Sequence, residues 1–220
     1  SDETNGCVLA MRSLVIKTDD GRIVLVDNGA GNKHLKQLSY YRFFNLIDLG
    51  TELRNRGIQP EEITDVVLTH LHFDHCGLYH AKDESTGHLF LSFPNANHWV
   101  SRKQWENFLH PNALERDSYF IENMQAVADA NSLRLLDADT SICPTIELRL
   151  YDGHTPGQNC SLYPYGRSDF CLCRRCYPPC SQRIPGMDLR LRHVSGHVIQ
   201  RETAHACRSR RKKASAHLLP

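Results

Sequence analysis

Short apolar blocks alternate with polar turns along most of the chain, and they predict strands interleaved with helices. Strands are expected at residues 11–17, 23–26, 65–68, 89–91, 98–100 and 146–151. The first two are separated by Asp19-Asp20-Gly21, which favours a tight hairpin. Helices are expected at residues 43–56, 60–63, 101–109 and 115–130. The mixed order of helices and strands predicts an α/β protein.

Helical spacing of apolar residues supports the first long helix, through Phe44, Ile47, Leu49 and Leu53. Gly57 is expected to end this helix, and Ser101 to cap the helix that begins after it. Four aromatic residues are interpreted as core, with the lining of a substrate pocket as the alternative: Trp99, Trp105, Phe108 and Phe120. Four histidines lack partner spacing and are interpreted as ordinary polar residues: His80, His88, His98 and His110.

Composition adds few constraints. A chain of 220 residues with 40% hydrophobic content can bury one full core, and its net charge of +1 gives no global field that favours nucleic acid or a membrane surface. No stretch is long and apolar enough to span a bilayer, and residues 1–4 lack signal-peptide character. The cysteines are scattered, so we expect a reduced, cytoplasmic protein. Because the chain begins with Ser1, we interpret it as a fragment or a processed product.

The strongest chemical signal is residues 69–77, directly after the apolar run 66–68. His70, His72, Asp74 and His75 lie within six residues at the end of a predicted strand. Imidazole nitrogens and carboxylate oxygens are the usual ligands of zinc and related cations. The two histidines of H-x-H project the same way from an extended segment, while the Asp-His pair can face a second ion. The alternative is a surface histidine cluster in a loop.

The segment Leu68 to Gly77 resembles the signature of the metallo-β-lactamase superfamily, and especially its lactonase-like branch. Similar pieces occur at Val26-Asp27-Asn28-Gly29 and at Gly153-His154-Thr155-Pro156-Gly157, and the resemblance runs from about Asp2 to about Gly166. It implies an αββα sandwich, with two mixed sheets face to face and helices outside. Relatives carry further N-terminal strands, so we expect this sandwich to be incomplete at both ends.

The resemblance also implies a binuclear zinc hydrolase. His70, His72 and His154 would hold the first ion, and Asp74 and His75 the second. Asp74 would also orient the nucleophile or move its proton. Asp27 would support residues 69–77, the metal loop, without binding an ion itself. A metal-activated hydroxide would attack the carbonyl of a small-molecule ester, lactone or amide. The substrate and the oligomeric state are left open.

The C-terminal part departs from this pattern. We expect a metallo-β-lactamase-like domain over residues 1–166 and an atypical, disordered Cys/Arg-rich tail over 167–220, where the bridging Asp and the late His of the family are missing. Residues 173–178 can be encoded so that dropping one base gives Val-Ala-Asp-Val-Ile-Pro, the missing strand. Residues 186–193, 202–213 and 214–219 shift likewise into family-like sequence. We therefore hypothesise a reading-frame shift near Gly166, natural or from a sequencing error.

Without that strand, we expect one tightly bound ion or none, and impaired hydrolysis. Two alternatives belong to other functional classes. The chain could be a catalytically inactive shifted product. Or its tail could form a zinc knuckle from Cys171, Cys173, Cys176 and Cys180, with His193, His197 and His205 downstream, and bind nucleic acid phosphate through the basic run 208–213. The cysteine spacing matches no common zinc finger, and a solvated basic tail is the simpler interpretation.

Overall fold

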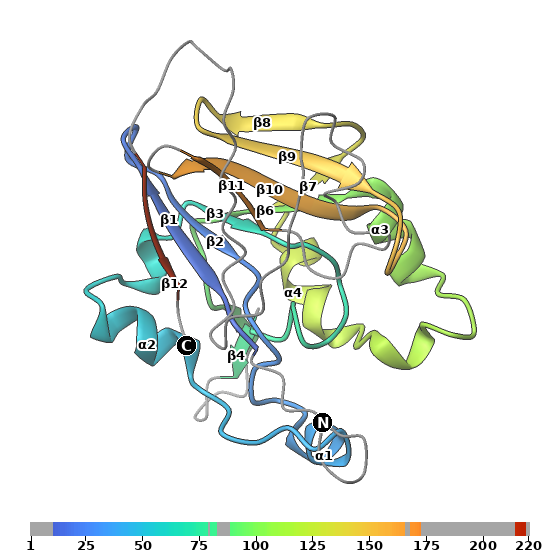
Figure 1. The fold of residues 1–220 in the computed structure, drawn as a ribbon. Helices are drawn as coiled ribbons and strands as arrows, with labels where there is room; N and C mark the ends of the chain where they lie inside the picture. Colours follow the sequence, from blue (N-terminus) through green and yellow to red (C-terminus); the bar gives the residue numbers. More distant parts are fainter. Residues whose placement is uncertain (1–10, 79, 83–88, 166–167, 173–213, 219–220) are drawn as a thin grey trace, which may run out of the picture.

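In the computed structural model, two β-sheets lie face to face and helices cover the outer side of the first sheet (Figure 1). The structure describes residues 11–78, 80–82, 89–165, 168–172 and 214–218. One strand of each sheet ends in a loop that carries predicted metal ligands. His70 and His72 follow a strand of the first sheet, and His154 follows a strand of the second.

The first sheet has six strands in the order β12-β1-β2-β3-β6-β7. Their bounds are Ala214–Leu218 for β12, Leu14–Thr18 for β1, Ile23–Val26 for β2, Asp65–Val67 for β3, Asn97–Ser101 for β6 and Leu133–Leu136 for β7. The predicted hairpin is confirmed, since β1 and β2 pair antiparallel. From β2 to β7 the pairing is parallel, with Val26 opposite Val67. The carboxyl ends of β2 and β3 therefore lie side by side at one edge.

The second sheet is antiparallel, in the order β11-β10-β9-β8. Its bounds are Ser168–Leu172 for β11, Gln158–Tyr165 for β10, Ile146–Tyr151 for β9 and Thr140–Cys143 for β8. A separate hairpin pairs β4, His80–Lys82, with β5, Leu89–Leu91. Two short pieces of the predicted tail, β11 and β12, thus extend the two sheets.

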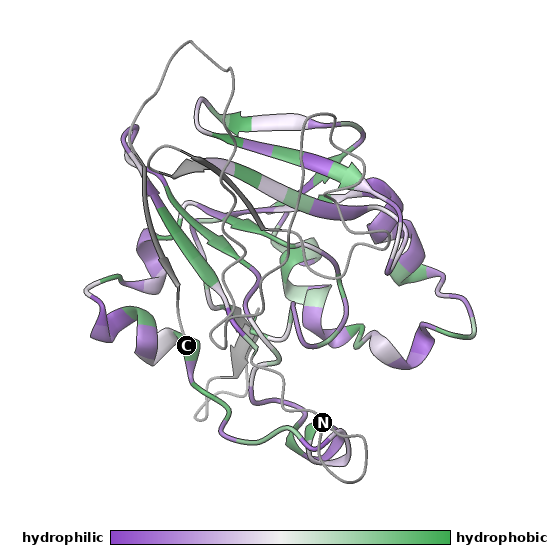
Figure 2. Cartoon of the chain, viewed as in Figure 1, coloured by the Kyte–Doolittle hydropathy of each residue, from purple (hydrophilic) through white to green (hydrophobic). Residues whose placement is uncertain are grey.

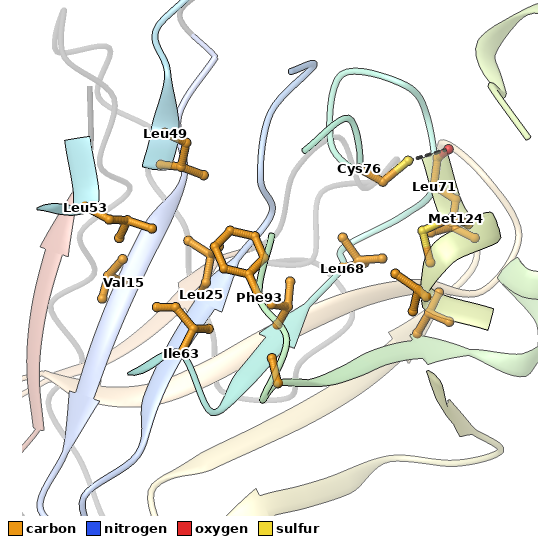
Figure 3. Packing of buried hydrophobic residues seen from close by; sticks show 14 of the residues in the cluster. Val15, Leu25, Leu49, Leu53, Ile63, Leu68, Leu71, Cys76, Phe93 and Met124 are labelled. Carbon is orange, nitrogen blue, oxygen red and sulfur yellow. Dashed lines mark hydrogen bonds between the residues drawn. The ribbon is translucent and has the colours of Figure 1, made fainter. Parts of the chain in front are cut away.

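Two hydrophobic clusters hold the layers together. Between the sheets, Ile16, Val24 and Val67 meet Leu148 and Tyr163. On the other face of the first sheet, the strand residues pack against α2 (Leu49–Asn55), α3 (Arg102–Leu109) and α4 (Glu122–Asp129). Figure 2 shows β1 and β2 as mainly hydrophobic, and Figure 3 shows Leu49 and Leu53 of α2 on the side of Val15 and Leu25. Among the described residues, no helix contributes a side chain to the cluster that contains the second sheet.

Three helices differ from the sequence prediction. The helix expected at residues 43–56 covers only Leu49–Asn55, because Asn45 adopts a left-handed φ of 51° and Asp48 caps the helix by accepting from the Thr51 amide. The expected partners Phe44 and Ile47 are 63% and 48% exposed. A short helix α1, Leu35–Tyr40, was not predicted.

The helix expected at residues 115–130 is divided into a 3₁₀ turn at Arg116–Ser118 and α4, because Tyr119 between them is extended. By contrast, Ser101 caps α3 as predicted, and Pro60–Glu62 forms a 3₁₀ turn. The proposed zinc knuckle and basic run lie outside the described residues, apart from the backbone of Cys171. Cys76, Cys143 and Cys160 are buried. Within the described ranges, no helix has the length and apolarity needed to cross a membrane.

His98 in β6 is not the ordinary polar residue that the sequence suggested. It is fully buried, and β6 lies between β3 and β7. Burial lowers the pKa of His98 to about 4. The native state therefore contains a neutral imidazole, whereas the unfolded chain binds a proton below a pKa of about 6.5.

We expect this difference to make folding pH-dependent. As the pH falls from about 6.5 towards 4, His98 becomes protonated in the unfolded chain but stays neutral in the native state. Up to about 3 kcal/mol of folding stability is therefore lost. Urea unfolding at pH 7.5 and pH 5 should show a smaller loss for His98→Gln than for the unsubstituted chain. His110→Gln, at an exposed position, is the control. Equal losses in all three proteins would refute the assignment.

Candidate metal centre

Two loops bring three histidines together. The loop after β3 carries His70 and His72, and the loop between β9 and β10 carries His154. One ring nitrogen from each residue lies within 4.8 Å of the others. The ring centroids are 4.6 Å apart for His70 and His72, and 4.8 Å apart for His72 and His154. The family resemblance had grouped these three residues, and in the structure they form one group that could hold a metal ion.

The donor atoms suit a divalent cation. Burial, followed by the neighbouring His154, lowers the pKa of His72 to about 4, so its imidazole is neutral at physiological pH. Nε2 of His72 is buried and makes no hydrogen bond, while Nδ1 lies 3.1 Å from Nε2 of His154. A neutral imidazole with an unused buried nitrogen offers a lone pair, which is what zinc requires. The three-imidazole set therefore fits the metal that the sequence pattern suggested.

Asp27 ties the end of β2 to the metal loop. Its carboxylate accepts hydrogen bonds from the Thr69 amide at 2.8 Å and from the Thr69 hydroxyl at 2.9 Å. Nδ1 of His75 lies 2.7 Å from the same carboxylate. Asp27 is 1% exposed and adopts a left-handed φ of 54°, which costs energy in a residue other than glycine. These contacts hold the strained residue in place.

Asp74 and His75 lie next to the three histidines but are paired with each other. Nε2 of His75 is 3.3 Å from the Asp74 carboxylate, and its ring centroid is 3.9 Å from that of His70. Burial acts to lower the pKa of His75, but Asp27 and Asp74 outweigh it and raise the pKa to about 9. The His75 ring thus lies between two carboxylates, with Nδ1 towards Asp27 and Nε2 towards Asp74.

The metal loop is closely packed on both sides. Leu71 and Cys76 lie in the core, and the Cys76 thiol donates to the Leu71 carbonyl, as Figure 3 shows. Burial raises the pKa of this thiol to about 12, so it is unreactive. A Cβ at Gly77 would lie 2.0 Å from the Ala30 backbone, which leaves room for glycine alone. The loop position is therefore determined by its packing.

A polar network that the sequence did not suggest borders the centre. Oε2 of Glu115 accepts from the Tyr119 hydroxyl at 2.8 Å, the Thr155 hydroxyl at 2.9 Å and the Asn107 amide at 2.8 Å. Burial alone would raise the pKa of Glu115, but these hydrogen bonds lower it. The carboxylate is thus ionised 3.9 Å from Nε2 of His72. Glu115 lies in a stretch predicted to be helix, so no sequence signal identified it.

Aromatic rings cover another side of the loop. Phe73 stacks on Phe120 with centroids 4.8 Å apart, and it also contacts Tyr41 at 5.1 Å and Phe43 at 5.8 Å. Phe120 was one of four aromatics interpreted as core or pocket. Of the others, Phe108 is buried, and Trp99 and Trp105 are partly buried against the two main clusters.

A model of the metallo-beta-lactamase superfamily matches residues 12–173. The chain belongs to that superfamily. An N-acyl homoserine lactonase from Bacillus thuringiensis is 27% identical over 105 residues, 48% of this chain and 34% of the relative. A Bacillus cereus N-acyl homoserine lactonase is 25% identical over 122 residues, 56% of this chain and 41% of the relative. The matches thus span less than half the length of these curated relatives.

Solved structures agree on the fold. A probable metal-dependent hydrolase from Staphylococcus aureus superimposes with a TM-score of 0.61 at 25% identity, over 69% of this chain and 53% of that one. A dizinc quorum-quenching lactonase gives a TM-score of 0.52 at 23% identity, over 71% of this chain and 53% of that one. The predicted metallo-beta-lactamase fold is therefore confirmed.

In this superfamily member, Asp27 should matter for stability as well as for the site. Asp27→Ala leaves the buried His75 without its closest carboxylate and the Thr69 amide without an acceptor. Breaking a buried ion pair in this way costs roughly 3–5 kcal/mol. Chemical denaturation of the metal-free protein should show this loss. Asp137→Ala, which breaks an exposed pair with Arg102, should leave stability nearly unchanged, and equal effects of the two substitutions would contradict this role for Asp27.

Proposed function

We propose that this chain is a metal-dependent hydrolase that cleaves a small-molecule lactone, ester or amide. The convergence of His70, His72 and His154 carries the proposal. Three imidazoles that converge from two strand-end loops, with hydrogen-bonded polar groups beside them, are typical of a catalytic metal site. Membership of the superfamily supports the same reaction class.

In this proposal, His70, His72 and His154 hold the first ion, which we infer to be zinc. A zinc ion bound there supplies a Lewis acid that polarises a carbonyl and lowers the pKa of water. The imidazoles bind through the nitrogens that converge, and burial keeps His72 neutral. Thr69 fixes the ring of His70, since its hydroxyl lies 3.1 Å from Nδ1.

Asp74 is proposed as the catalytic carboxylate. It is the more exposed member of the Asp74–His75 pair, with 23% of its side chain accessible against 2% for His75. An accessible carboxylate beside the ligand group can accept a proton from an attacking water and return it to the leaving oxygen. In this role Asp74 would exchange its contact with Nε2 of His75, now 3.3 Å away, for one with the attacking water.

A lactone is the substrate class that we favour. The curated relatives are N-acyl homoserine lactonases, although each match spans less than half of that relative. The rings of Phe73, Phe120, Phe43 and Tyr41 supply an apolar wall beside the histidines. Such a wall can hold the apolar part of a substrate while the metal site holds its carbonyl.

The second ion is proposed to bind weakly or not at all. Asp74 and His75 are its two ligands in this chain, and the family's bridging Asp and late His are missing from the sequence. We propose that a frame shift near Gly166 explains why these two ligands are missing. Their loss is expected to impair turnover. The genomic sequence tests it: a genome that encodes the printed tail, with no family-like frame beside it, would refute the shift.

We expect zinc-dependent hydrolysis of N-acyl homoserine lactones, slow but measurable, to depend on His72. Removing residues that only support a metal ligand costs about 10–100-fold, so removing the ligand itself in His72→Ala should lower kcat/KM by at least about 100-fold. His110→Ala is the control, because His110 is exposed at the end of α3. Turnover is followed with zinc and with a chelator. Equal rates in His72→Ala and the control would contradict the role of His72 as a metal ligand. Bound zinc without turnover in the unsubstituted chain would instead indicate the catalytically inactive, frame-shifted product.

A further inference from the structure

We propose that Glu115 is a positioning residue, whose carboxylate clamps the two histidine loops at metal-binding distance and compensates the charge of the ion. This inference rests on the proposed metal site and extends it. Glu115 does not belong to the three-histidine group. Its location between the two loops suggests what it does.

The carboxylate gathers donors from three parts of the fold. Oε2 accepts from Asn107 on α3, from Tyr119 after the 3₁₀ turn, and from Thr155 in the β9–β10 loop. Thr155 follows His154 directly, so its hydrogen bond at 2.9 Å fixes the backbone that carries this histidine. Thr155 is 1% exposed, and its hydroxyl also lies 3.0 Å from the Tyr119 hydroxyl.

Ser118 and Tyr119, which follow Glu115, also contact the loop that carries His70 and His72. The Ser118 carbonyl accepts a hydrogen bond from the Phe73 amide at 2.8 Å, and Phe73 follows His72 directly. The Tyr119 ring lies 5.0 Å from the His72 ring, centroid to centroid. Residues 115–119 therefore contact the neighbours of both His72 and His154.

Helix α3 anchors this arrangement. Gln104 is fully buried and donates through Nε2 to the Tyr119 hydroxyl at 3.0 Å. Ser101, the cap of α3, donates to the Gly157 carbonyl at the far end of the His154 loop. A Cβ on Gly157 would meet the Ser101 hydroxyl at 2.4 Å, so the loop lies directly against the helix. Helix α3 therefore contacts both Tyr119 and the His154 loop, the two parts that Glu115 connects.

Charge gives Glu115 its second effect. Its Oε2 is 3.9 Å from Nε2 of His72, the nitrogen that makes no hydrogen bond, and its side chain is only 17% exposed. A divalent ion held by three neutral imidazoles carries its full charge, and a partly buried carboxylate at this range stabilises it. Oε2 accepts three hydrogen bonds and Oε1 accepts one from the Asn112 amide at 3.2 Å, so the carboxylate acts through space rather than as a fourth ligand.

The test is a Co²⁺ titration of the metal-free chain, followed by the visible absorption of the bound ion. Glu115→Gln keeps the size of the side chain but removes its charge and one acceptor oxygen. We expect it to weaken Co²⁺ binding by about 10–100-fold, as changes around metal ligands do, and to alter the cobalt spectrum. Glu106→Gln, at an exposed position on α3, is the matched control and should bind as the unsubstituted chain does.

Unfolding of each metal-free variant separates positioning from general stability. If Glu115→Gln binds Co²⁺ with unchanged affinity and spectrum, the inference is overturned, whatever its stability. If Glu115→Gln does not fold, Thr155→Val, which removes one donor beside His154, is expected to weaken binding in the same direction, and unchanged binding there overturns it equally. An unsubstituted chain that binds no Co²⁺ would overturn the proposed metal site itself, so the two failures are distinguishable.

Discussion

The hydrogen bonds of the buried Asp27 carboxylate are the interaction on which the centre depends. Parallel pairing of β2 and β3 ends both strands at the same edge, so the residue after β2 lies beside the loop after β3. Asp27 uses this proximity to hold both Thr69 and His75. A carboxylate removed from water needs such partners, because an unpaired buried charge is strongly destabilising. Stability and site geometry thus share the same contacts.

The second sheet completes the site by delivering one further loop. The hairpin of β9 and β10 reaches the first sheet through the Asn159 amide, which donates to the Thr69 carbonyl at 2.7 Å. That contact brings the loop of His154 to the loop of His70 and His72. The apolar cluster between the sheets sets their separation, and the segment from Glu115 to Tyr119 spans the two loops. Residues far apart in sequence are held by a frame of packing and hydrogen bonds.

The sequence indicated those parts whose signal is local. The hairpin of β1 and β2, the capped helix after Ser101 and the H-x-H-x-D-H run after a strand are all contiguous patterns, and the structure contains each of them. The resemblance to a family, rather than spacing, connected His154 with His70 across more than 80 residues. The prediction failed where the backbone conformation of one residue interrupts a periodic pattern. Phe44 and Ile47 have helical spacing, yet a left-handed Asn45 and the Asp48 cap start the helix later.

Glu115 is a residue whose role could not be predicted from the sequence. Its partners Asn107, Tyr119 and Thr155 are ordinary polar residues, and only the folded chain shows that they share one carboxylate oxygen. His98 is a further case, since burial rather than sequence context shifts its pKa. Chemistry that depends on convergence of distant residues is visible in a sequence only when a motif marks it.

The central claim is that the chain holds one metal ion on three histidines and lacks the residues for a tight second one. Elemental analysis of protein purified in the presence of zinc tests this directly. The account predicts close to one zinc per chain, lost in His154→Ala. Two tightly bound ions would mean that the printed tail supplies the missing bridge. No bound metal, or the same content in His154→Ala, would contradict the assignment of the three histidines.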